Sequence, residues 1–309
     1  MLLIELACMD IVIVNWNSGL QIKTCVESLK NQCRAIVVDN ASSDGSASAV
    51  SHLSGVELVR AKENLGFGKA CNLGAQHTRD DYLLFLNPDA AVYADTLENS
   101  LAFMQDPSNA DVGICGVQLK DETGHVARSC ARFPTPWGFV AHAVGLDRFF
   151  PRLGHFMAEW PHDSTRDVDH VIGAFFLVRR SVFDALGGFD ERFFLYLEDL
   201  DFSRRARQAG WRSVYLADVQ AFHAGGGTSN QVRARRLFYS LRSRLLYAHK
   251  HFGAAGFALT CAATLLLEPL SRTALALGRR SAVACKETWA AYALLWRWLP
   301  QWVFKGVTR

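Results

Sequence analysis

Short apolar runs alternate with helix-like stretches through residues 10–120, and this alternation constrains the fold more than any other feature. Four runs are typical of strands, at residues 11–14, 35–38, 56–59 and 82–86. Apolar residues at helical spacing lie between them, at 20–29 and 68–77 for example. The pattern predicts an α/β fold with a mostly parallel sheet, right-handed crossovers and helices on both faces.

Polar side chains follow the strands at the points where they end. They are Asn15 and Asn17 after the first run, Asp39 and Asn40 after the second, and Asn87 and Asp89 after the fourth. Open α/β sheets bind ligands at the carboxyl ends of their strands. We therefore expect these residues to line a binding site.

A glycine-rich turn, residues 64–72, follows the third strand and opens a helix. Such a turn can bring backbone N–H groups to a phosphate. The spacing is not that of a dinucleotide fingerprint, because Cys71 stands where G-x-G-x-x-G needs its third glycine. This disfavours a Rossmann dehydrogenase.

Three carboxylates, Glu198, Asp199 and Asp201, crowd the predicted start of a later helix. Such crowding is costly unless a metal, a cation or a proton-transfer role uses it. Glu198 and Asp201 share a helix face, whereas Asp199 points elsewhere. The alternative is a solvated acidic helix start that complements the helix dipole.

Asp89 and His223 are the candidate metal ligands. A carboxylate at a strand end can hold a divalent cation, Mg²⁺ or Mn²⁺, that bridges a diphosphate. His223 precedes glycines 225–227, which allow close backbone approach. A plain turn at Asp89 and a structural histidine at 223 are the alternatives.

The charge of the chain is uneven. Residues 231–309 hold 13 Lys/Arg and 2 Asp/Glu, whereas residues 1–230 hold 20 Lys/Arg and 28 Asp/Glu. The tail begins with a basic helix at 231–251 and continues with an apolar run at 253–267, which Glu268-Pro269 is expected to stop. That run is shorter than the roughly 20 residues of a spanning helix.

The final stretch sets Trp289, Tyr292, Trp296 and Leu299 at helical spacing, with Trp298 and Trp302 beside them. Interfacial aromatics and cations favour a helix lying in lipid headgroups. A helical cap or a dimer interface is the alternative. Nucleic-acid binding is disfavoured, because such patches interleave basic and polar residues with exposed stacking groups.

Two further patterns bound the protein class. The start of the chain carries Glu5 and lacks a basic region, so residues 1–9 do not resemble a signal peptide. The eight cysteines form no C-x-x-C pair, which predicts reduced thiols and no zinc site.

Residues 121–168 form an irregular aromatic-rich stretch, expected to be a lid, a binding loop or an ordinary insertion.

Seven motifs occur in an order that resembles family-2 inverting glycosyltransferases, specifically the bacterial rhamnosyltransferase-like branch, over about residues 9–252. They are residues 14–17, 38–46, 64–68, 86–89, 187–191 and 198–201, and His223. The resemblance implies a GT-A nucleotide-diphospho-sugar transferase fold and a nucleotide-sugar donor.

The resemblance also assigns roles to single residues. Asp39 would contact the nucleoside base beside Asn15, Asn17 and Asn40, and Asn64, Gly66, Gly68, Asn72 and Asn87 would complete the nucleotide–sugar pocket. Asp89 and His223 would hold the cation, although Asn87 replaces the first acid of the D-x-D motif. Asp199 would be the catalytic base and Glu198 would orient the site, with Asp201 and Arg204 supporting the helix.

We therefore predict a GT-A domain at 1–252, with a nucleotide-binding half at 1–120 and an acceptor half at 121–252, and a membrane-associating tail at 253–309. The expected donor is dTDP-L-rhamnose and the expected acceptor a lipid-diphosphate-linked glycan. The expected location is the cytoplasmic face of the plasma membrane, with 231–309 on anionic lipid. UDP-galactofuranose or another UDP- or GDP-sugar, or a non-catalytic nucleotide-sugar-binding role, are the alternatives. The sequence leaves the oligomeric state open.

Overall fold

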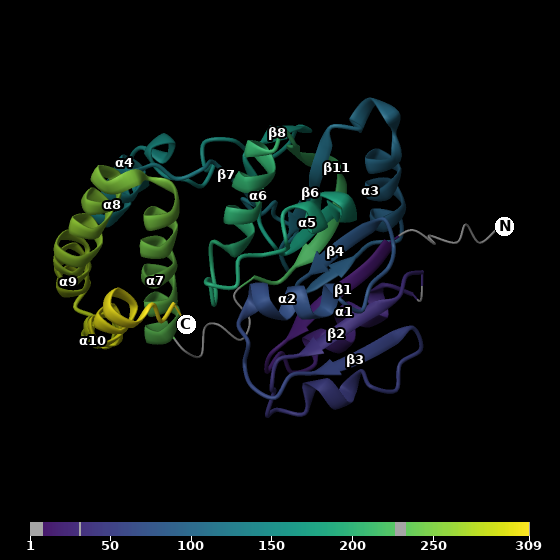
Figure 1. The fold of residues 1–309 in the computed structure, drawn as a ribbon, viewed down its shortest axis with the longest axis horizontal. Helices are drawn as coiled ribbons and strands as arrows, with labels where there is room; N and C mark the ends of the chain where they lie inside the picture. Colours follow the sequence, from purple (N-terminus) through teal and green to yellow (C-terminus); the bar gives the residue numbers. More distant parts are fainter. Residues whose placement is uncertain (1–8, 31, 226–232, 309) are drawn as a thin grey trace. The chain divides into compact units, whose positions relative to one another are not determined.

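The computed structural model describes residues 9–30, 32–225 and 233–308, and these form two compact units (Figure 1). The sheet unit comprises residues 1–131, 160–190 and 199–228, and the helical unit comprises 132–159, 191–198 and 229–309, both as far as they are described. The predicted division into a glycosyltransferase domain at 1–252 and a membrane-associating tail at 253–309 is a division by function, and it stays a prediction. The compact units divide the chain elsewhere. The prediction that no signal peptide precedes residue 9 lies outside the described residues.

The sheet unit is built on one mixed sheet in the order β3-β2-β1-β4-β10-β6-β11-β5, with β8 also paired to β11. Its strands are β1 Met9–Asn15, β2 Ala35–Asp39, β3 Val56–Arg60, β4 Tyr82–Leu86, β5 Ala90–Val92, β6 Val112–Lys120, β8 Arg166–Val168, β10 Phe175–Arg179 and β11 Arg212–His223. Two short strands, β7 Cys130–Ala131 and β9 His170–Val171, pair separately.

The four strands predicted from sequence are confirmed, and they pair in parallel as β3-β2-β1-β4. Their side chains are almost all buried in β1, β2 and β4, as expected for strands covered on both faces. The next strand, β10, runs antiparallel between β4 and β6, and β11 returns parallel to β6. The directions of these later strands were not predicted.

Several α-helices pack against the strands of the sheet unit (Figure 1). Their bounds are α1 Gln21–Ser28, α2 Phe67–Ala75, α3 Thr96–Gln105, α5 Arg180–Ala185 and α6 Glu198–Gln208. α2 packs tightly on the sheet, because a Cβ atom at Gly74 would lie 2.4 Å from Cγ1 of Val12. The cysteines resolved in this part of the chain are free thiols, as predicted.

The helical unit contains α4 Pro136–Ala143, α7 Arg233–His251, α8 Gly253–Ala262, α9 Glu268–Gly278 and α10 Ala282–Lys305. The predicted stop at Glu268-Pro269 is wrong. A π-helical segment, Ala263–Leu267, joins α8 directly to α9, and its wider hydrogen-bonding pattern accommodates a proline that lacks an N–H group. Glu268 is buried and pairs with Arg244 and Arg272, which neutralise its charge.

The predicted basic helix was expected to face lipid, but two of its arginines, Arg242 and Arg244, are buried. Arg244 pairs with Glu268, and the Arg242 guanidinium lies 5.1–5.4 Å from the ring centres of Phe194, Phe238 and Tyr239. Both arginine side chains are buried, so they are not available to lipid headgroups. Arg233 and Arg235 are exposed.

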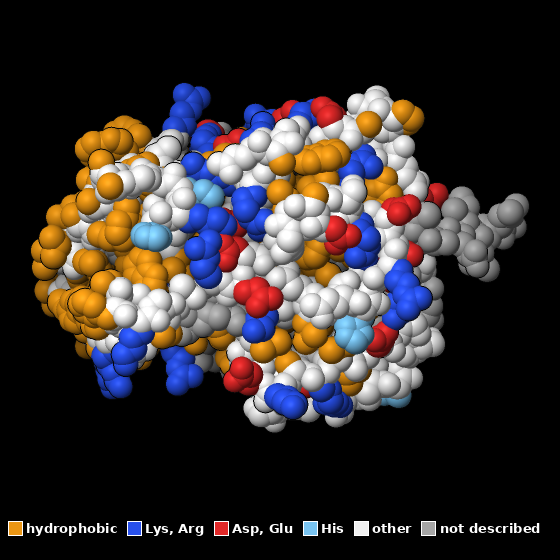
Figure 2. Space-filling model, viewed as in Figure 1, with side chains coloured by type: hydrophobic (Ala, Val, Ile, Leu, Met, Phe, Trp, Pro, Cys, Tyr) orange, Lys and Arg blue, Asp and Glu red, His pale blue; other side chains and the backbone are white. Residues whose placement is uncertain are grey.

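The final helix is also divided. Tyr292 and Trp298 of α10 are buried, whereas Trp289 and Trp296 are exposed. Together with neighbours on the π-helical segment, α9 and α10, these exposed residues form an apolar surface. Its members are Leu266, Leu267, Leu270, Leu277, Val283, Trp289, Trp296, Val303 and Phe304. Figure 2 shows hydrophobic side chains gathered over this part of the helical unit.

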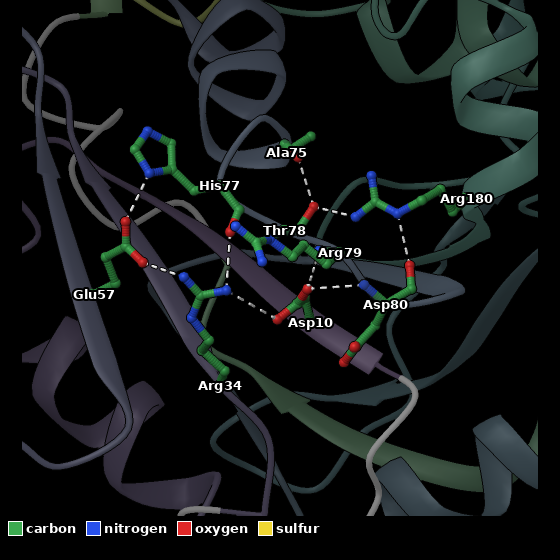
Figure 3. A network of polar contacts seen from close by, with 9 residues as sticks. All are labelled: Asp10, Arg34, Glu57, Ala75, His77, Thr78, Arg79, Asp80 and Arg180. Atoms are coloured by element: carbon green, nitrogen blue, oxygen red, sulfur yellow. Dashed lines mark hydrogen bonds and ion pairs between the residues drawn. The ribbon is translucent and has the colours of Figure 1, made fainter.

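A network of charged groups lies at the amino edge of the parallel strands (Figure 3). Asp10, buried at the start of β1, accepts hydrogen bonds from the backbone N–H groups of Arg79 at 2.7 Å and Asp80 at 3.2 Å. Arg34 lies 3.9 Å from Asp10, also pairs with Glu57, and donates to the carbonyl of His77 at 2.9 Å. These contacts tie the starts of β1, β2, β3 and β4 together.

Candidate active site

Asn15 and Asp39 end neighbouring strands, and their side chains meet at the carboxyl edge of the sheet. The Asn15 amide donates to the Asp39 carboxylate at 3.1 Å and to the Ser46 hydroxyl at 2.9 Å. Both side chains are buried, where unpaired polar groups would be costly. The Arg60 guanidinium, at the end of β3, lies 3.5 Å from the other Asp39 oxygen.

Asn17 ties the loop after β1 to the loop after β2. Its φ of 50° is left-handed, a conformation that asparagine tolerates better than most residues. Its side-chain oxygen accepts the Ser43 N–H at 2.8 Å, and its own N–H donates to the Ser42 hydroxyl at 3.1 Å. The predicted nucleotide residues at 15, 17 and 39 therefore lie in one cluster.

Asn40 organises the glycine-rich turn before α2. Its amide nitrogen donates to Asn64 at 3.0 Å and to the Gly66 carbonyl at 3.1 Å, and its oxygen accepts the Leu65 N–H at 2.7 Å. Gly66 has φ 74° and ψ 179°, a combination that requires glycine. Gly68 is buried in the first turn of α2, so the backbone of this turn is fixed at the carboxyl edge.

Asn72, on α2, was predicted to line the donor pocket, and in the structure its side chain bonds to the backbone of Phe189. Its amide nitrogen donates to the Phe189 carbonyl at 2.8 Å, and its oxygen accepts the Phe189 N–H at 2.9 Å. This pair of bonds fixes the turn that contains Gly188, whose φ is 73°. A contact of Asn72 with donor stays a prediction.

An open hollow of about 550 Å³ lies beside the Asp39–Arg60 pair. It is lined by Arg60, Ala61, Lys62, Glu63, Leu65 and Leu73. Two cations at the wall of a hollow beside the nucleotide residues suit an anionic ligand. Neither Arg60 nor Lys62 was singled out from the sequence.

Asp89 and His223 come together from two strands that are far apart in the chain. β11 pairs with β5 so that His223 lies opposite Ala90, the neighbour of Asp89. The His223 Nε2 atom is 3.2 Å from Asp89 Oδ1, and both side chains are largely buried. A register shift in β11 between Leu216 and Gln220 allows its last residues to make this pairing.

The pair suits a divalent cation. Neighbouring ligands of an octahedral ion, each bound at about 2.1 Å, lie about 3 Å apart, close to the observed spacing. Within the described residues no group of three or more His, Cys, Asp or Glu side chains is arranged to hold a metal. Asp89 and His223 are the residues that would hold such a cation. Of the glycines after His223, residues 226 and 227 lie outside the described residues.

Asp199 lies in the first turn of α6, where the helix dipole favours a negative charge. Its Oδ2 atom accepts the Gly173 N–H at 2.8 Å and lies 3.5 Å from Nε2 of His170, and its Oδ1 accepts the Leu200 N–H at 2.8 Å. Burial raises the pKa of Asp199, but His170 and the two backbone donors outweigh it, so the pKa falls below the usual value. The carboxylate is therefore ionised at neutral pH.

Two consecutive residues connect Asp199 to the donor side of the site. Gly173 donates to Asp199, and the carbonyl of Ala174 accepts the Asn87 N–H at 3.1 Å. A Cβ atom at Gly173 would lie 3.1 Å from Asp199 Oδ2 and 3.5 Å from the ring of Phe67, the first residue of α2. The candidate base, the turn that carries Asn87 and Asp89, and the start of α2 thus converge.

Glu198 is buried directly before Asp199. The chain enters α6 through Tyr196 and Leu197, both left-handed, with φ values of 69° and 65°. Such conformations cost about 1–2 kcal/mol each for residues other than glycine. Strain of this kind clusters at functional sites, and no sequence signal announced it.

Asp201 is fully buried and is held by a cation that the sequence reading overlooked. Arg205 contacts it at 2.8 Å and also donates to the carbonyls of Leu186 and Gly188, both at 2.8 Å. The supporting role predicted for Arg204 stays a prediction, and Arg205 supports the helix through Asp201. The spacing of four residues between Asp201 and Arg205 was the available signal.

Comparisons with known proteins agree with this geometry. A model of the family described as Glycosyl transferase family 2 matches residues 10–187. The N-acetylglucosaminyl-diphospho-decaprenol L-rhamnosyltransferase of Mycobacterium tuberculosis is 30% identical over 265 residues, which cover 79% of this chain and 85% of the relative. Rhamnosyltransferase WbbL of Escherichia coli K12 is 27% identical over 250 residues, 77% of this chain and 91% of the relative.

Among solved structures, mannosyltransferase PcManGT from Pyrobaculum calidifontis, in complex with GDP-Man and Mn²⁺, has a TM-score of 0.54 and 19% identity. The match covers 97% of this chain and 81% of that one. At this identity the likeness concerns the fold, and it confirms the predicted GT-A architecture. The chain therefore belongs to glycosyl transferase family 2 and is a glycosyltransferase of the rhamnosyltransferase-like kind.

Proposed function

We propose that this enzyme transfers L-rhamnose from dTDP-L-rhamnose, with inversion, to a hydroxyl of a lipid-diphosphate-linked glycan. The observation that carries the transfer chemistry is Asp199, an ionised carboxylate held at the carboxyl edge beside the Asn87–Asp89 turn. The choice of sugar and acceptor draws on the relatives, one of which is named as a rhamnosyltransferase acting on N-acetylglucosaminyl-diphospho-decaprenol.

The reaction follows from the roles of these groups. Asp199 takes the proton of the acceptor hydroxyl as that oxygen attacks the anomeric carbon of rhamnose. The bond between that carbon and the diphosphate breaks, and dTDP leaves with the electron pair. A single displacement of this kind inverts the anomeric centre.

Asp89 and His223 are the residues that would hold the divalent cation. When bound, the cation supplies positive charge where negative charge grows on the leaving diphosphate. The backbone N–H groups at the start of α2, fixed by Asn40 and Asn64, point toward the same edge and favour an anion. The cluster around Asn15, Asn17 and Asp39 would receive the nucleoside.

We further propose that the helical unit rests on the cytoplasmic face of the plasma membrane, where it meets the lipid-linked acceptor. Arg233 and Arg235 would attract anionic lipid, at about 1 kcal/mol for each cation near the surface. The apolar surface of the π-helical segment, α9 and α10 would enter the headgroup region. Among the described helices, 253–278 alone combines the length and the apolarity needed to cross a membrane, and 28% of its most apolar stretch is buried.

The donor and acceptor are tested together. Purified protein is given dTDP-rhamnose, UDP-galactofuranose, UDP-glucose, UDP-N-acetylglucosamine or GDP-mannose, with and without Mg²⁺ or Mn²⁺, and a synthetic N-acetylglucosaminyl-diphospho-polyprenol. We expect rhamnosylated lipid with the first donor and the α/β configuration opposite to that of the donor. Transfer from another donor would correct the sugar, and donor binding without transfer would favour a non-catalytic role.

Membrane docking is tested by sedimentation of the full chain with phosphatidylglycerol vesicles, and with phosphatidylcholine vesicles as the uncharged comparison. Leu270→Ser combined with Phe304→Ser should reduce sedimentation. Leu20→Ser is the matched control, because Leu20 is an equally exposed leucine of the sheet unit. Equal sedimentation of all three proteins would rule out docking through the apolar surface.

A further inference from the structure

His170 is a buried histidine that no sequence motif singled out, and its ring contacts α6, the helix that carries the candidate base. It stands on β9, with its side chain 4% exposed. Its Nε2 atom is 3.5 Å from Asp199 Oδ2, and its Nδ1 atom is 2.9 Å from the Ser203 hydroxyl. Both ring nitrogens are therefore engaged with residues of the same helix.

The position of the protons follows from a count of donors. The Ser203 hydroxyl has one proton, and both His170 Nδ1 and the Asp199 carbonyl, at 3.1 Å, can accept it. If the proton goes to Nδ1, the neutral ring carries its own proton on Nε2. If it goes to the carbonyl, Nδ1 must donate to Ser203, and a bare Nε2 would then repel the Asp199 carboxylate unless the ring is charged. In both favourable arrangements Nε2–H points at Asp199.

The same count separates the two oxygens of Asp199. Oδ2 faces two donors: it accepts the Gly173 N–H at 2.8 Å, and the Nε2 atom of His170 lies 3.5 Å away. Oδ1 accepts the Leu200 N–H, and within the described residues no second donor to it is found. Oδ1 therefore keeps a lone pair for a proton from outside the protein.

We propose that His170 is a positioning residue for transfer: it engages Asp199 Oδ2, so that Oδ1 receives the proton of the acceptor hydroxyl. This inference rests on the proposed function, which makes Asp199 the base. Gly173 belongs to the same device, because a Cβ atom there would press on Oδ2 at 3.1 Å. Segment 170–173 thus places two groups against Asp199 Oδ2, the His170 ring and the Gly173 N–H. The missing side chain of Gly173 leaves room for that oxygen.

The charged groups around Asp199 indicate that its pKa should rise when His170 is removed. From β9, His170 is the titratable group that faces the carboxylate. On its own helix, Asp199 is flanked by Glu198 and by Asp201, whose charge Arg205 balances. Loss of His170 would leave burial to dominate, and the pKa of Asp199 would rise.

The test compares His170→Phe, which keeps a ring but no ring nitrogens, with His170→Gln, which keeps a donor. We expect His170→Phe to lower kcat by about 10-fold or more with the donor KM unchanged, and to move the acid limb of the kcat profile to higher pH. His170→Gln should restore part of both. Titration of Asp199 by carboxyl ¹³C NMR, with its resonance identified by Asp199→Asn, should show a raised pKa in His170→Phe.

Unchanged kcat, pH profile and Asp199 pKa in His170→Phe would overturn the inference. If the pKa rises but Asp199→Asn transfers sugar normally, Asp199 is not the base and the positioning role falls with the proposed function. If His170→Phe does not fold, Ser203→Ala serves instead, because it frees the ring to turn. It should then reduce kcat while leaving donor binding intact, and wild-type kcat in that variant would count against the inference.

Discussion

The two edges of the parallel strands both carry buried acids, and they use them in opposite ways. At the amino edge Asp10 is surrounded by donors, with two backbone N–H groups and the Arg34 guanidinium directed at it. At the carboxyl edge the loops are held mainly by neutral amides, those of Asn15, Asn17 and Asn40. The amino edge closes its network within the protein, as Figure 3 shows.

The two edges differ in which charged side chains remain available to bind a ligand. Amides fix loop geometry without adding charge, and at this edge the Asp199 carboxylate is ionised. Asp89 and Asp199 each contact a histidine, His223 and His170 respectively. We infer that the amino edge stabilises the sheet and the carboxyl edge carries the chemistry. The following changes test that division.

The largest effect is expected from Asp199→Asn. The amide keeps the shape of the side chain but cannot take a proton at neutral pH, so transfer should fall by about 10²-fold to 10⁴-fold. Donor binding, measured by calorimetry, should remain. Wild-type turnover in this variant would remove Asp199 from the mechanism.

Arg205→Ala tests the comparison with an ion pair that lies near the carboxyl edge but has only a structural role. The substitution removes the pair between Arg205 and Asp201. It leaves the fully buried Asp201 without this cation and the carbonyls of Leu186 and Gly188 without their donor. The free energy of unfolding in urea should fall by about 3–5 kcal/mol. Arg205→Lys keeps the charge but loses the several N–H donors of the guanidinium. If it lowers the free energy of unfolding as much as Arg205→Ala does, the hydrogen-bonding geometry matters more than the charge.

The smallest effect is expected from Glu57→Gln at the amino edge. Hydrogen bonds from His77 and then Arg34 lower the pKa of Glu57, but the group is half-exposed, so the pair should contribute less than about 1 kcal/mol. That contribution is present above the unfolded pKa of about 4.3 and is lost as the pH falls through the lowered folded value. The free energies of unfolding of the wild type and Glu57→Gln, measured in urea between pH 7 and pH 3, should therefore become equal at low pH. At pH 7 they should become equal in high salt. A constant difference would contradict the ion-pair account.

Much of the sheet unit was predictable, because its order follows local patterns. The apolar runs of β1, β2, β3 and β4 and the polar residues after them are contiguous in sequence, and parallel pairing brings those ends together. Asp89 and His223 were candidate ligands from their sequence context, and the resemblance to a family assigned Asp199 the role of base. The proximity of Asp89 and His223 depends on β11 pairing with β5, which no local pattern encodes.

What was missed lies in contacts between distant segments. His170 meets Asp199 across 29 positions of the chain, and its own neighbourhood looks like an ordinary strand. The stop expected at Glu268-Pro269 failed for a similar reason, since Arg244 makes the buried glutamate tolerable and a π-helical segment accommodates the proline. Propensity gave way to tertiary pairing in both regions.

The division of labour between the edges is tested most directly by measuring Asp199→Asn and Asp10→Asn in the same two assays, sugar transfer and urea unfolding. Asp10→Asn should lower the free energy of unfolding by about 1–3 kcal/mol, because buried donors lose a charged acceptor, and leave kcat unchanged. Asp199→Asn should abolish transfer, and it should also lower stability, because each Asp199 oxygen accepts a backbone N–H that an amide nitrogen cannot accept. If Asp10→Asn abolishes transfer while the protein stays folded, or if Asp199→Asn changes stability alone, the two edges do not divide the work in this way.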